Sequence, residues 1–504
     1  MITLPIDCLY QIFQHFKDDI KTLHSCLLSS RSCCELIIPI LWSDPWRLIQ
    51  KKKSTPEKYK LSSISLLSIL LSRLPFESKR LLHDNHVHWT SQTTFLNYIT
   101  YCRSLDFYGI LDMLDAVSLH YQPFGILHKD IKTLVGQEIC KMIILQSTKI
   151  THMNISEMSY SFFDLFQHLS LNDSQSLSHL NEFKYQVTEN SNIPNFYNMF
   201  NVCKNISNLI IYLGTTPSES FIDLIRSQNA IKFMDIIFEF NPPSKLINSL
   251  LLHFNTLTHL YISCSELIFS KIFSVYPTFS NLRFLKYRFY DDNNFYVYNE
   301  DVKNKDISLP SLEILEFESD SSFSYRIMAQ IIQGTQGKLE RIYMSYPDYD
   351  ENPSIINQYI LKSCPNLKVL TTVVNNATLD IVLAILTCQN LEGIALYSST
   401  DEINSILNHL SLHPLKNLLN LKFINIDSWT FSTKNMKLFL KTLEKEELVK
   451  KLNISLIYLQ IDIDSDKIID LFEAYYLKGI IASYFIEEES DIIDDFDDWQ
   501  RILI

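Results

Sequence analysis

The chain has 504 residues, of which 46% are hydrophobic and 20% charged, and only 8 are glycine. That length exceeds one compact core of about 50 to 250 residues, so the sequence predicts several domains or a stack of repeats. The formal net charge of −13 disfavours a nucleic-acid partner, because phosphate binding needs clustered lysine and arginine.

The cysteines and the N-terminus indicate an intracellular chain. Ten cysteines are scattered without any C-x-x-C spacing, which argues against a zinc site or a thioredoxin-like motif. The N-terminus lacks the basic and continuous apolar parts of a signal peptide, and the most apolar run, 61–74, is too short to span a bilayer. We therefore expect a reduced protein in the cytoplasm, the nucleus or both, with no membrane partner.

Residues 3–42 predict three short amphipathic helices. An apolar stripe follows Pro5 at helical spacing and comprises Leu9, Ile12, Phe13 and Phe16. Asp18 and Asp19 can cap a second helix, and a third helix is expected to end near Pro39. Three helices this short bury too little surface to be stable alone, so they need a partner.

The order of these residues resembles the F-box. That resemblance implies that residues 1–45 dock on the small adaptor subunit of cullin-based SCF ubiquitin ligases. The adaptor-binding residues would be Leu4, Pro5, Leu9, Ile12, Phe13, Phe16, Leu23, Leu27, Pro39, Leu41 and Trp42. One position departs from the family: F-boxes usually carry a tryptophan two residues after the position of Arg31, and this chain has Cys33 there. The alternative is an unrelated three-helix cap that packs on the rest of the chain.

Residues 46–149 form a less regular zone. Apolar residues at helical spacing predict helices over 66–74 and 131–145. Leu105, Tyr108 and Ile110 are spaced as in an extra, atypical first repeat. The zone is interpreted as a helical linker that leads into the repeats.

From residue 150 the pattern Φ-x-x-Φ-x-Φ, in which Φ is apolar, recurs twelve times. The units begin at Ile150, Leu180, Ile206, Ile231, Leu257, Leu282, Leu312, Leu339, Leu367, Leu391, Leu418 and Ile454. Only Thr372 departs from the pattern, and a near-fixed period of this kind is typical of a solenoid. The intervening segments show helical spacing, so each unit is expected to be a strand followed by a helix.

These units resemble leucine-rich repeats. The resemblance implies an α/β fold in which residues 150–486 form a curved solenoid of about twelve units, with parallel strands inside and helices outside. An acidic tail, 487–504, follows and holds eight carboxylates between Glu487 and Asp498. The family prefers Asn or Cys three residues beyond the third Φ, and only Asn375 fits, so the turns must be held in other ways.

Strand residues alternate in direction, so the positions between the apolar ones should face away from the helices. These positions mix aromatic residues with both signs of charge, as protein-binding hot spots do. The candidate substrate-binding residues are Phe233, Asp235, Tyr261, Phe284, Lys286, Glu316, Arg341 and Tyr343. The alternative is that the aromatic rings pack sideways on neighbouring strands.

No nucleotide-binding, metalloprotease or serine-hydrolase motif occurs in the sequence. His83, His86 and His88 have a spacing that a metal could use, but we interpret them as loop histidines. No catalytic residue, metal or cofactor is therefore predicted. The sequence favours a substrate-recognition subunit of an SCF-type ubiquitin ligase, which binds the adaptor, through it the cullin, and an unknown protein substrate. The alternatives are a repeat scaffold without a ligase role and a hydrolase hidden in residues 43–149.

Overall fold

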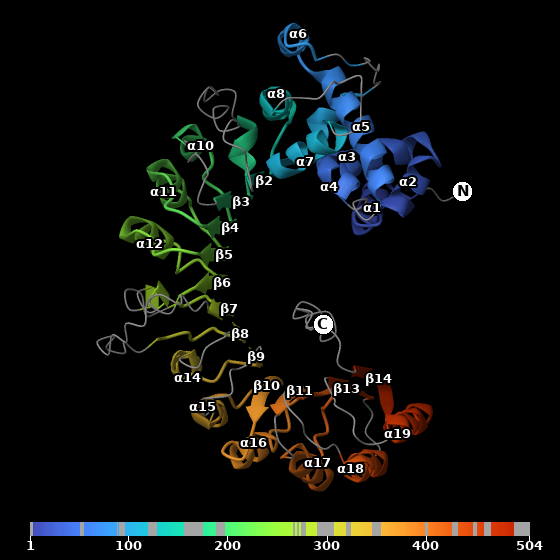
Figure 1. Ribbon diagram of the computed structural model, residues 1–504, viewed down its shortest axis with the longest axis vertical. Coiled ribbons are helices and arrows are strands. Elements are labelled where there is room, and N and C mark those ends of the chain that lie inside the picture. The colour runs from blue at the N-terminus through green and yellow to red at the C-terminus, as the bar shows by residue number, and fades with distance from the viewer. Residues whose placement is uncertain are drawn as a thin grey trace. The chain divides into compact units, whose positions relative to one another are not determined.

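The computed structural model describes residues 4–50, 55–87, 89, 96–118, 129–155, 175–187, 197–265, 268–269, 272–273, 279–289, 307–318, 324–344, 354–398, 402–425, 432–446, 451–457 and 465–487. The chain divides into two compact units, residues 1–253 and residues 254–504. The strand order of the parallel sheet follows the chain from β1 to β14 (Figure 1). The predicted α/β fold, N-terminal helices followed by a long parallel sheet of β–α units, is confirmed.

The first unit begins with helices. They are α1 (Ile6–His15), α2 (Ile20–Leu27), α3 (Arg31–Ser43), α4 (Pro45–Gln50), α5 (Pro56–Arg73), α6 (Phe76–Asp84), η1 (Tyr98–Tyr101), α7 (Phe107–Ser118) and α8 (Lys129–Gln146). Asp19 caps α2 as expected, because its carboxylate accepts a hydrogen bond from the backbone N–H of Thr22 at 3.0 Å. The predicted end of the third helix near Pro39 is wrong. Proline removes one N–H of the helix, but α3 continues past it to Ser43.

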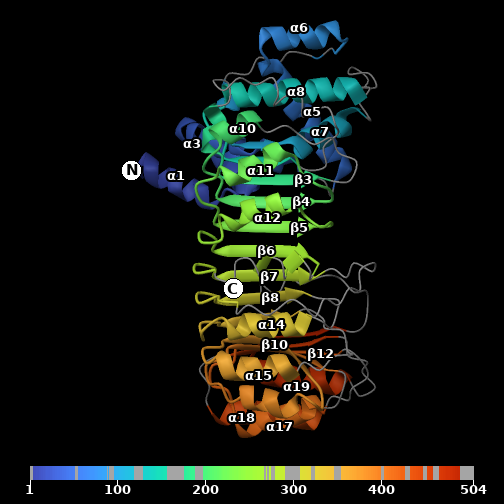
Figure 2. The same cartoon turned by 90° about the vertical axis from the view of Figure 1, so that its left-hand side faces the viewer.

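The described part of the first unit contains five parallel strands. They are β1 (Ser104–Asp106), β2 (His152–Ile155), β3 (Glu182–Val187), β4 (Asn208–Leu213) and β5 (Phe233–Phe238). Between them lie η3 (Gln175–His179), α10 (Tyr197–Val202) and α11 (Glu219–Arg226), and α12 (Ser244–Leu251) follows β5. Helices α10 to α12 cover one face of the strands (Figure 2).

The second unit continues the same alternation. Its strands are β6 (His259–Cys264), β7 (Phe284–Phe289), β8 (Ile314–Glu318), β9 (Arg341–Met344), β10 (Val369–Val374), β11 (Gly393–Ser398), β12 (Asn420–Asn425), β13 (Leu452–Ile457) and β14 (Ile481–Glu487). Its longer helices are α14 (Ser324–Gln333), α15 (Ser354–Ser363), α16 (Leu379–Ile385), α17 (Glu402–Leu412), α18 (Thr433–Lys445) and α19 (Ser465–Leu477).

The apolar triplets form the core under the helices. Leu260 and Leu285, for example, pair across β6 and β7, and both are fully buried. Thr372 stands in the row of the third apolar position, where it pairs with Leu396 of β11, and it is fully buried too. Its hydroxyl donates to the side-chain oxygen of the buried Asn357 on α15 at 2.7 Å, so the polar position is matched by a polar partner.

The structure corrects the register at both ends of the repeat series. In the last predicted unit Ile454 pairs with Leu421, so Ile454 holds the second apolar position and not the first. At the other end Leu105 pairs with Met153, and the predicted partners Tyr108 and Ile110 lie in α7. Apolar residues three apart occur in both segments, and only pairing with the neighbouring strand decides between the two alignments.

Asparagine side chains hold turns at both ends of the strands. Asn375 accepts hydrogen bonds from the backbone N–H groups of Ala377 and Thr378 at 3.0 and 3.1 Å, as the repeat resemblance implied. Elsewhere an amide just before the first Φ donates to a backbone oxygen of the preceding unit. These bonds run from Asn281 to Asn255, from Asn366 to Gly337, and from Asn417 to Gln389.

Candidate functional site

A group of large apolar side chains lies exposed on the first helices. We call it the α1 apolar surface, and it comprises Leu4, Ile6, Tyr10, Ile12, Phe16 and Leu28. Ile12 and Phe16 are each 40% exposed and lie one helical turn apart, at the end of α1 and just beyond it. Leu4, Ile12 and Phe16 were predicted from the sequence, whereas the others follow only from their exposure.

Other residues of the predicted adaptor-binding set are buried between the three helices. Phe13 and Leu23 form a core with Ile37 and Ile40, and all four are buried. Leu9, Leu27 and Leu41 pack partly buried against this core. These side chains hold α1, α2 and α3 together. Leu23 presents no accessible surface to a partner, and Phe13 is only 6% exposed.

The remaining predicted positions lie on or near α3. Trp42 stacks on Tyr98, with ring centroids 4.6 Å apart, so it packs on the helical zone that follows. Pro39 is half-buried inside α3, and Pro5 is the exposed N-cap of α1. Cys33, where the family has tryptophan, packs against the three-helix core, and hydrogen bonds from Ser30 and Ser29 lower the pKa of its thiol.

A second candidate surface lies on the second unit, on the strand face away from the helices. We call it the β6–β9 strand surface, and it comprises Tyr261, Phe284, Lys286, Arg288, Glu316, Glu318, Arg341 and Tyr343. Tyr261 pairs with Lys286, Lys286 with Glu316, and Glu316 with Tyr343, so four strands place these residues in one row. Phe284 and Arg341 both pair with Ile314 in the row beside it.

The aromatic residues of this surface pack on one another. The Phe284 ring lies 5.0 Å from that of Tyr261 and 5.9 Å from that of His259, measured between centroids. Phe284 and Tyr343 are buried, whereas Tyr261 remains half-buried. The sideways packing that was the alternative interpretation is therefore present at Phe284.

The charged residues of this surface form a connected set. The Lys286 amine lies 2.8 Å from Glu318 and 3.5 Å from Glu316, and Arg288 lies 3.6 Å from Glu318. Burial of Lys286 opposes its charge, but the hydrogen bond and charge of Glu318, with Glu316, outweigh it and raise the pKa of the amine.

Arg288 and Glu318 were missed in the sequence. The apolar triplet ends one residue before each of them, at Tyr287 and Phe317, whereas the strands continue. The alternation of strand side chains, extended by one step, would have indicated both.

The two remaining candidates, Phe233 and Asp235, lie on β5 in the first unit. They pair with Asn208 and Ile210 of β4, and both are half-buried. Their strand face is thus the one away from the helices, as predicted, but they belong to a different unit from the other six.

Within the described ranges no group of three or more His, Cys, Asp and Glu side chains could hold a metal. Exposed His83 and His86 lie at the end of α6, and His88 falls outside the described residues, as does the acidic tail after Glu487. None of the helices in the described part of the chain is long and apolar enough to cross a membrane.

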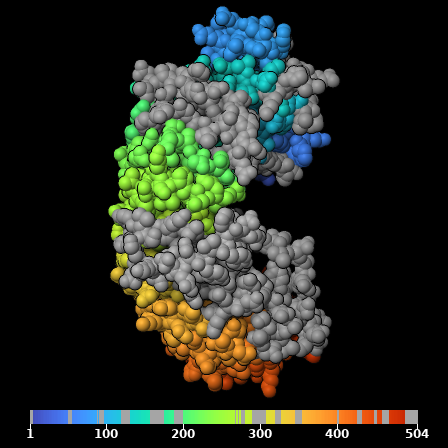
Figure 3. All heavy atoms as spheres, turned by 60° about the vertical axis from the view of Figure 1, so that its left-hand side comes forward, coloured from blue at the N-terminus to red at the C-terminus, as the bar shows by residue number. Residues whose placement is uncertain are grey.

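Helix α6, blue in Figure 3, exposes two apolar side chains outside the two candidate surfaces, Phe76 and Leu81.

Comparison with known proteins adds no relative: no protein-family model matches this chain, and no curated protein matches it.

Proposed function

We propose that this protein is a substrate-recognition subunit of an SCF-type ubiquitin ligase. In this proposal α1 to α3 are an F-box that binds the ligase adaptor, and through it the cullin, while the repeats bind a protein substrate. The chain itself is not an enzyme. Ubiquitin transfer occurs on other subunits, and the receptor acts by raising the effective concentration of substrate lysines near them.

The α1 apolar surface is the observation that carries this proposal. Its helices already have their own core around Phe13 and Leu23, so they do not need Ile12 or Phe16 for folding. Several large apolar side chains that stay exposed on short helices are typical of a protein-binding site. In an F-box, a surface of this kind is covered by the ligase adaptor. SCF-type ligases act inside the cell, which agrees with the expected cytoplasmic or nuclear location.

The alternative is a repeat scaffold in which the N-terminal helices only cap the first strand. One observation favours it: the backbone N–H of Arg103, next to β1, donates to the backbone oxygen of Ser43 at the end of α3, at 2.8 Å. The end of α3 thus does act as a cap. Capping by α3 leaves the outer side of α1 exposed, so the two roles use different surfaces of the same helices.

A pull-down of the full chain with adaptor and cullin tests the proposal. The variant Ile12→Ala with Phe16→Ala should lose most of the adaptor, because truncating central interface residues typically costs about 2 kcal/mol or more. The matched control is Phe76→Ala with Leu81→Ala, which removes an aromatic and an aliphatic side chain from α6 that are at least as exposed as Phe16 and Ile12. The control should retain the adaptor.

Two results would contradict the F-box assignment. One is that the unchanged chain recovers no adaptor. The other is that the Ile12 and Phe16 variant recovers as much as the control does. The scaffold alternative predicts the first of these.

A further inference from the structure

The β6–β9 strand surface has a charge arrangement that its composition alone does not show. Its cations and anions differ in accessibility: the side chain of Arg288 is 53% exposed, whereas those of Glu318 and Glu316 are 15% and 4% exposed. Lys286 lies between, with 23% of its side chain exposed. The carboxylates are therefore more covered than the cations, and a partner that approaches this surface meets mainly the positive charge of Arg288.

Arg341 adds to this positive charge. It is half-buried on β9, and its guanidinium donates a hydrogen bond to the hydroxyl oxygen of Tyr343 on the same strand. The surface thus combines three cationic side chains, Lys286, Arg288 and Arg341, with two carboxylates that are largely covered. On a chain of net charge −13 this is a local reversal of sign.

Aromatic rings lie beside the cations. Tyr261 pairs with Lys286 across β6 and β7, and its ring packs on Phe284. A half-buried tyrosine paired with a lysine offers contact area and hydrogen bonds at a small cost in conformational entropy. Guanidinium groups bind carboxylates with two parallel hydrogen bonds, which adds geometric selectivity.

We infer that the β6–β9 strand surface binds an acidic peptide segment of a protein partner, whose carboxylates pair with Arg288 and Arg341 beside an apolar side chain on Tyr261. This inference rests on the substrate-binding half of the proposed function and supplies the chemistry of the partner. Charge complementarity selects this occupant, since Arg288 is the most exposed charged side chain among the ion pairs of this surface and its carboxylates are largely covered.

A nucleic acid is also acidic and stacks on aromatic rings, but the observations favour a peptide. Nucleic-acid sites neutralise many phosphates with clustered lysine and arginine, and this surface has only three cations, two of which pair with its two carboxylates. Glu316 and Glu318 would repel a dense row of phosphates. A peptide carries fewer charges and can place an apolar residue between them.

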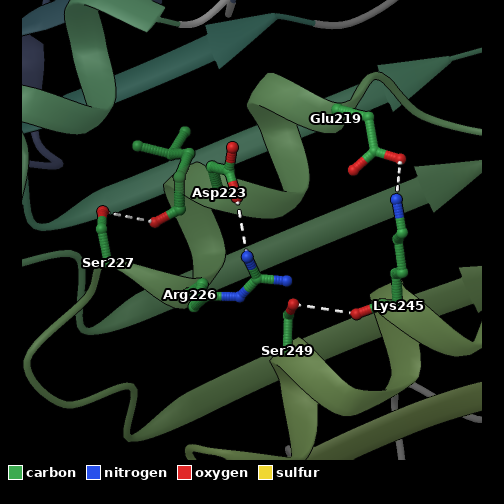
Figure 4. A network of polar contacts seen from close by, with 7 residues as sticks. Glu219, Asp223, Arg226, Ser227, Lys245 and Ser249 are labelled. Atoms are coloured by element: carbon green, nitrogen blue, oxygen red, sulfur yellow. Dashed lines mark hydrogen bonds and ion pairs between the residues drawn. The ribbon is translucent and has the colours of Figure 1, made fainter.

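The test is a titration of the full chain with a labelled glutamate-rich peptide that contains one tyrosine. Its glutamine counterpart and a single-stranded oligonucleotide are titrated in parallel. The variant Arg288→Ala is compared with Arg226→Ala on α11 of the first unit. Arg226 is a matched control, because its side chain is 51% exposed and is paired with one carboxylate, that of Asp223, at 3.0 Å (Figure 4).

We expect the glutamate peptide to bind more tightly than the glutamine peptide and to be released by salt. Arg288→Ala should weaken this binding about fivefold, and Arg226→Ala should leave it unchanged. Equal binding of the two peptides, equal effects of the two arginine variants, or tighter binding of the oligonucleotide would overturn the inference. Adaptor pull-down of the same Arg288→Ala protein is independent of this outcome, so failure of the peptide site and failure of the F-box assignment are distinguished.

Discussion

The indole N–H of Trp46 donates a hydrogen bond to the backbone oxygen of Ser104 at 3.0 Å. Trp46 follows the N-terminal three-helix group and is almost fully buried, and Ser104 opens β1, the first strand of the sheet. An edge strand exposes backbone groups that invite pairing with other chains, and covering it is one way in which proteins prevent this. Trp46 therefore joins the candidate docking helices to the repeats within the first unit.

Replacing Trp46 should destabilise the first unit. We expect Trp46→Ala to lower its free energy of unfolding by about 3 to 5 kcal/mol, because the substitution leaves a large cavity. Trp46→Phe should cost less, since it removes the hydrogen bond but keeps most of the apolar volume. Urea denaturation of both variants measures the difference, and equal stability of Trp46→Ala and the unchanged chain would contradict the role assigned to this residue.

Neighbouring residues of α1 should respond in opposite ways to truncation. Phe13→Ala is expected to destabilise the three-helix group by about 3 kcal/mol or more, because Phe13 lies in its core. Ile12→Ala should change stability by less than about 0.5 kcal/mol, because the side chain is 40% exposed. Limited proteolysis of residues 1–45 reports on this group directly. Similar protection of the two variants would show that the division of α1 into core and surface is wrong.

The buried pair of Thr372 and Asn357 should show a non-additive mutational effect. Thr372→Val leaves the side-chain oxygen of Asn357 without its donor, which should cost about 1 to 3 kcal/mol. Adding Asn357→Leu should recover much of that loss, because no unsatisfied polar atom then remains from this pair. Thr371→Val, on the other face of the same strand, serves as the control in thermal melts. Additive losses in the double variant would contradict this account.

Acid should weaken the first unit partly through His253. Burial lowers the pKa of this imidazole, which donates from Nε2 to the backbone oxygen of Ile225 at 2.9 Å. Below the ordinary value of about 6.5 the unfolded chain takes up a proton that the folded chain resists. Stability from this group is therefore complete above that pH and falls as the pH drops below it.

The variant His253→Gln can still donate to Ile225 but does not titrate. Its melting temperature should fall less than that of the unchanged chain between pH 7 and pH 5, values that bracket about 6.5. An identical pH dependence of the two proteins would remove His253 from this explanation.

The sequence by itself determined the repeat architecture. Apolar residues at a near-fixed interval decide which residues form strands and which face of each strand is buried, because side chains alternate along a strand. That is why Leu260, Leu285 and Leu315 were placed correctly in the core before any pairing was known. The same alternation placed Tyr261, Lys286 and Glu316 on the opposite face, where the structure has them.

Only the tertiary structure decided what depends on a neighbouring element. Ile12 and Phe13 are adjacent and both apolar, and it is the packing of α2 and α3 against Phe13 that leaves Ile12 exposed. The apolar pattern alone aligns Ile454 three residues out of register, and its pairing with Leu421 shows the correct position. Likewise, the contrast in exposure between Arg288 and Glu318 arises between β7 and β8, and no local pattern encodes it, because the two residues are 30 positions apart in the chain and are adjacent only in the sheet.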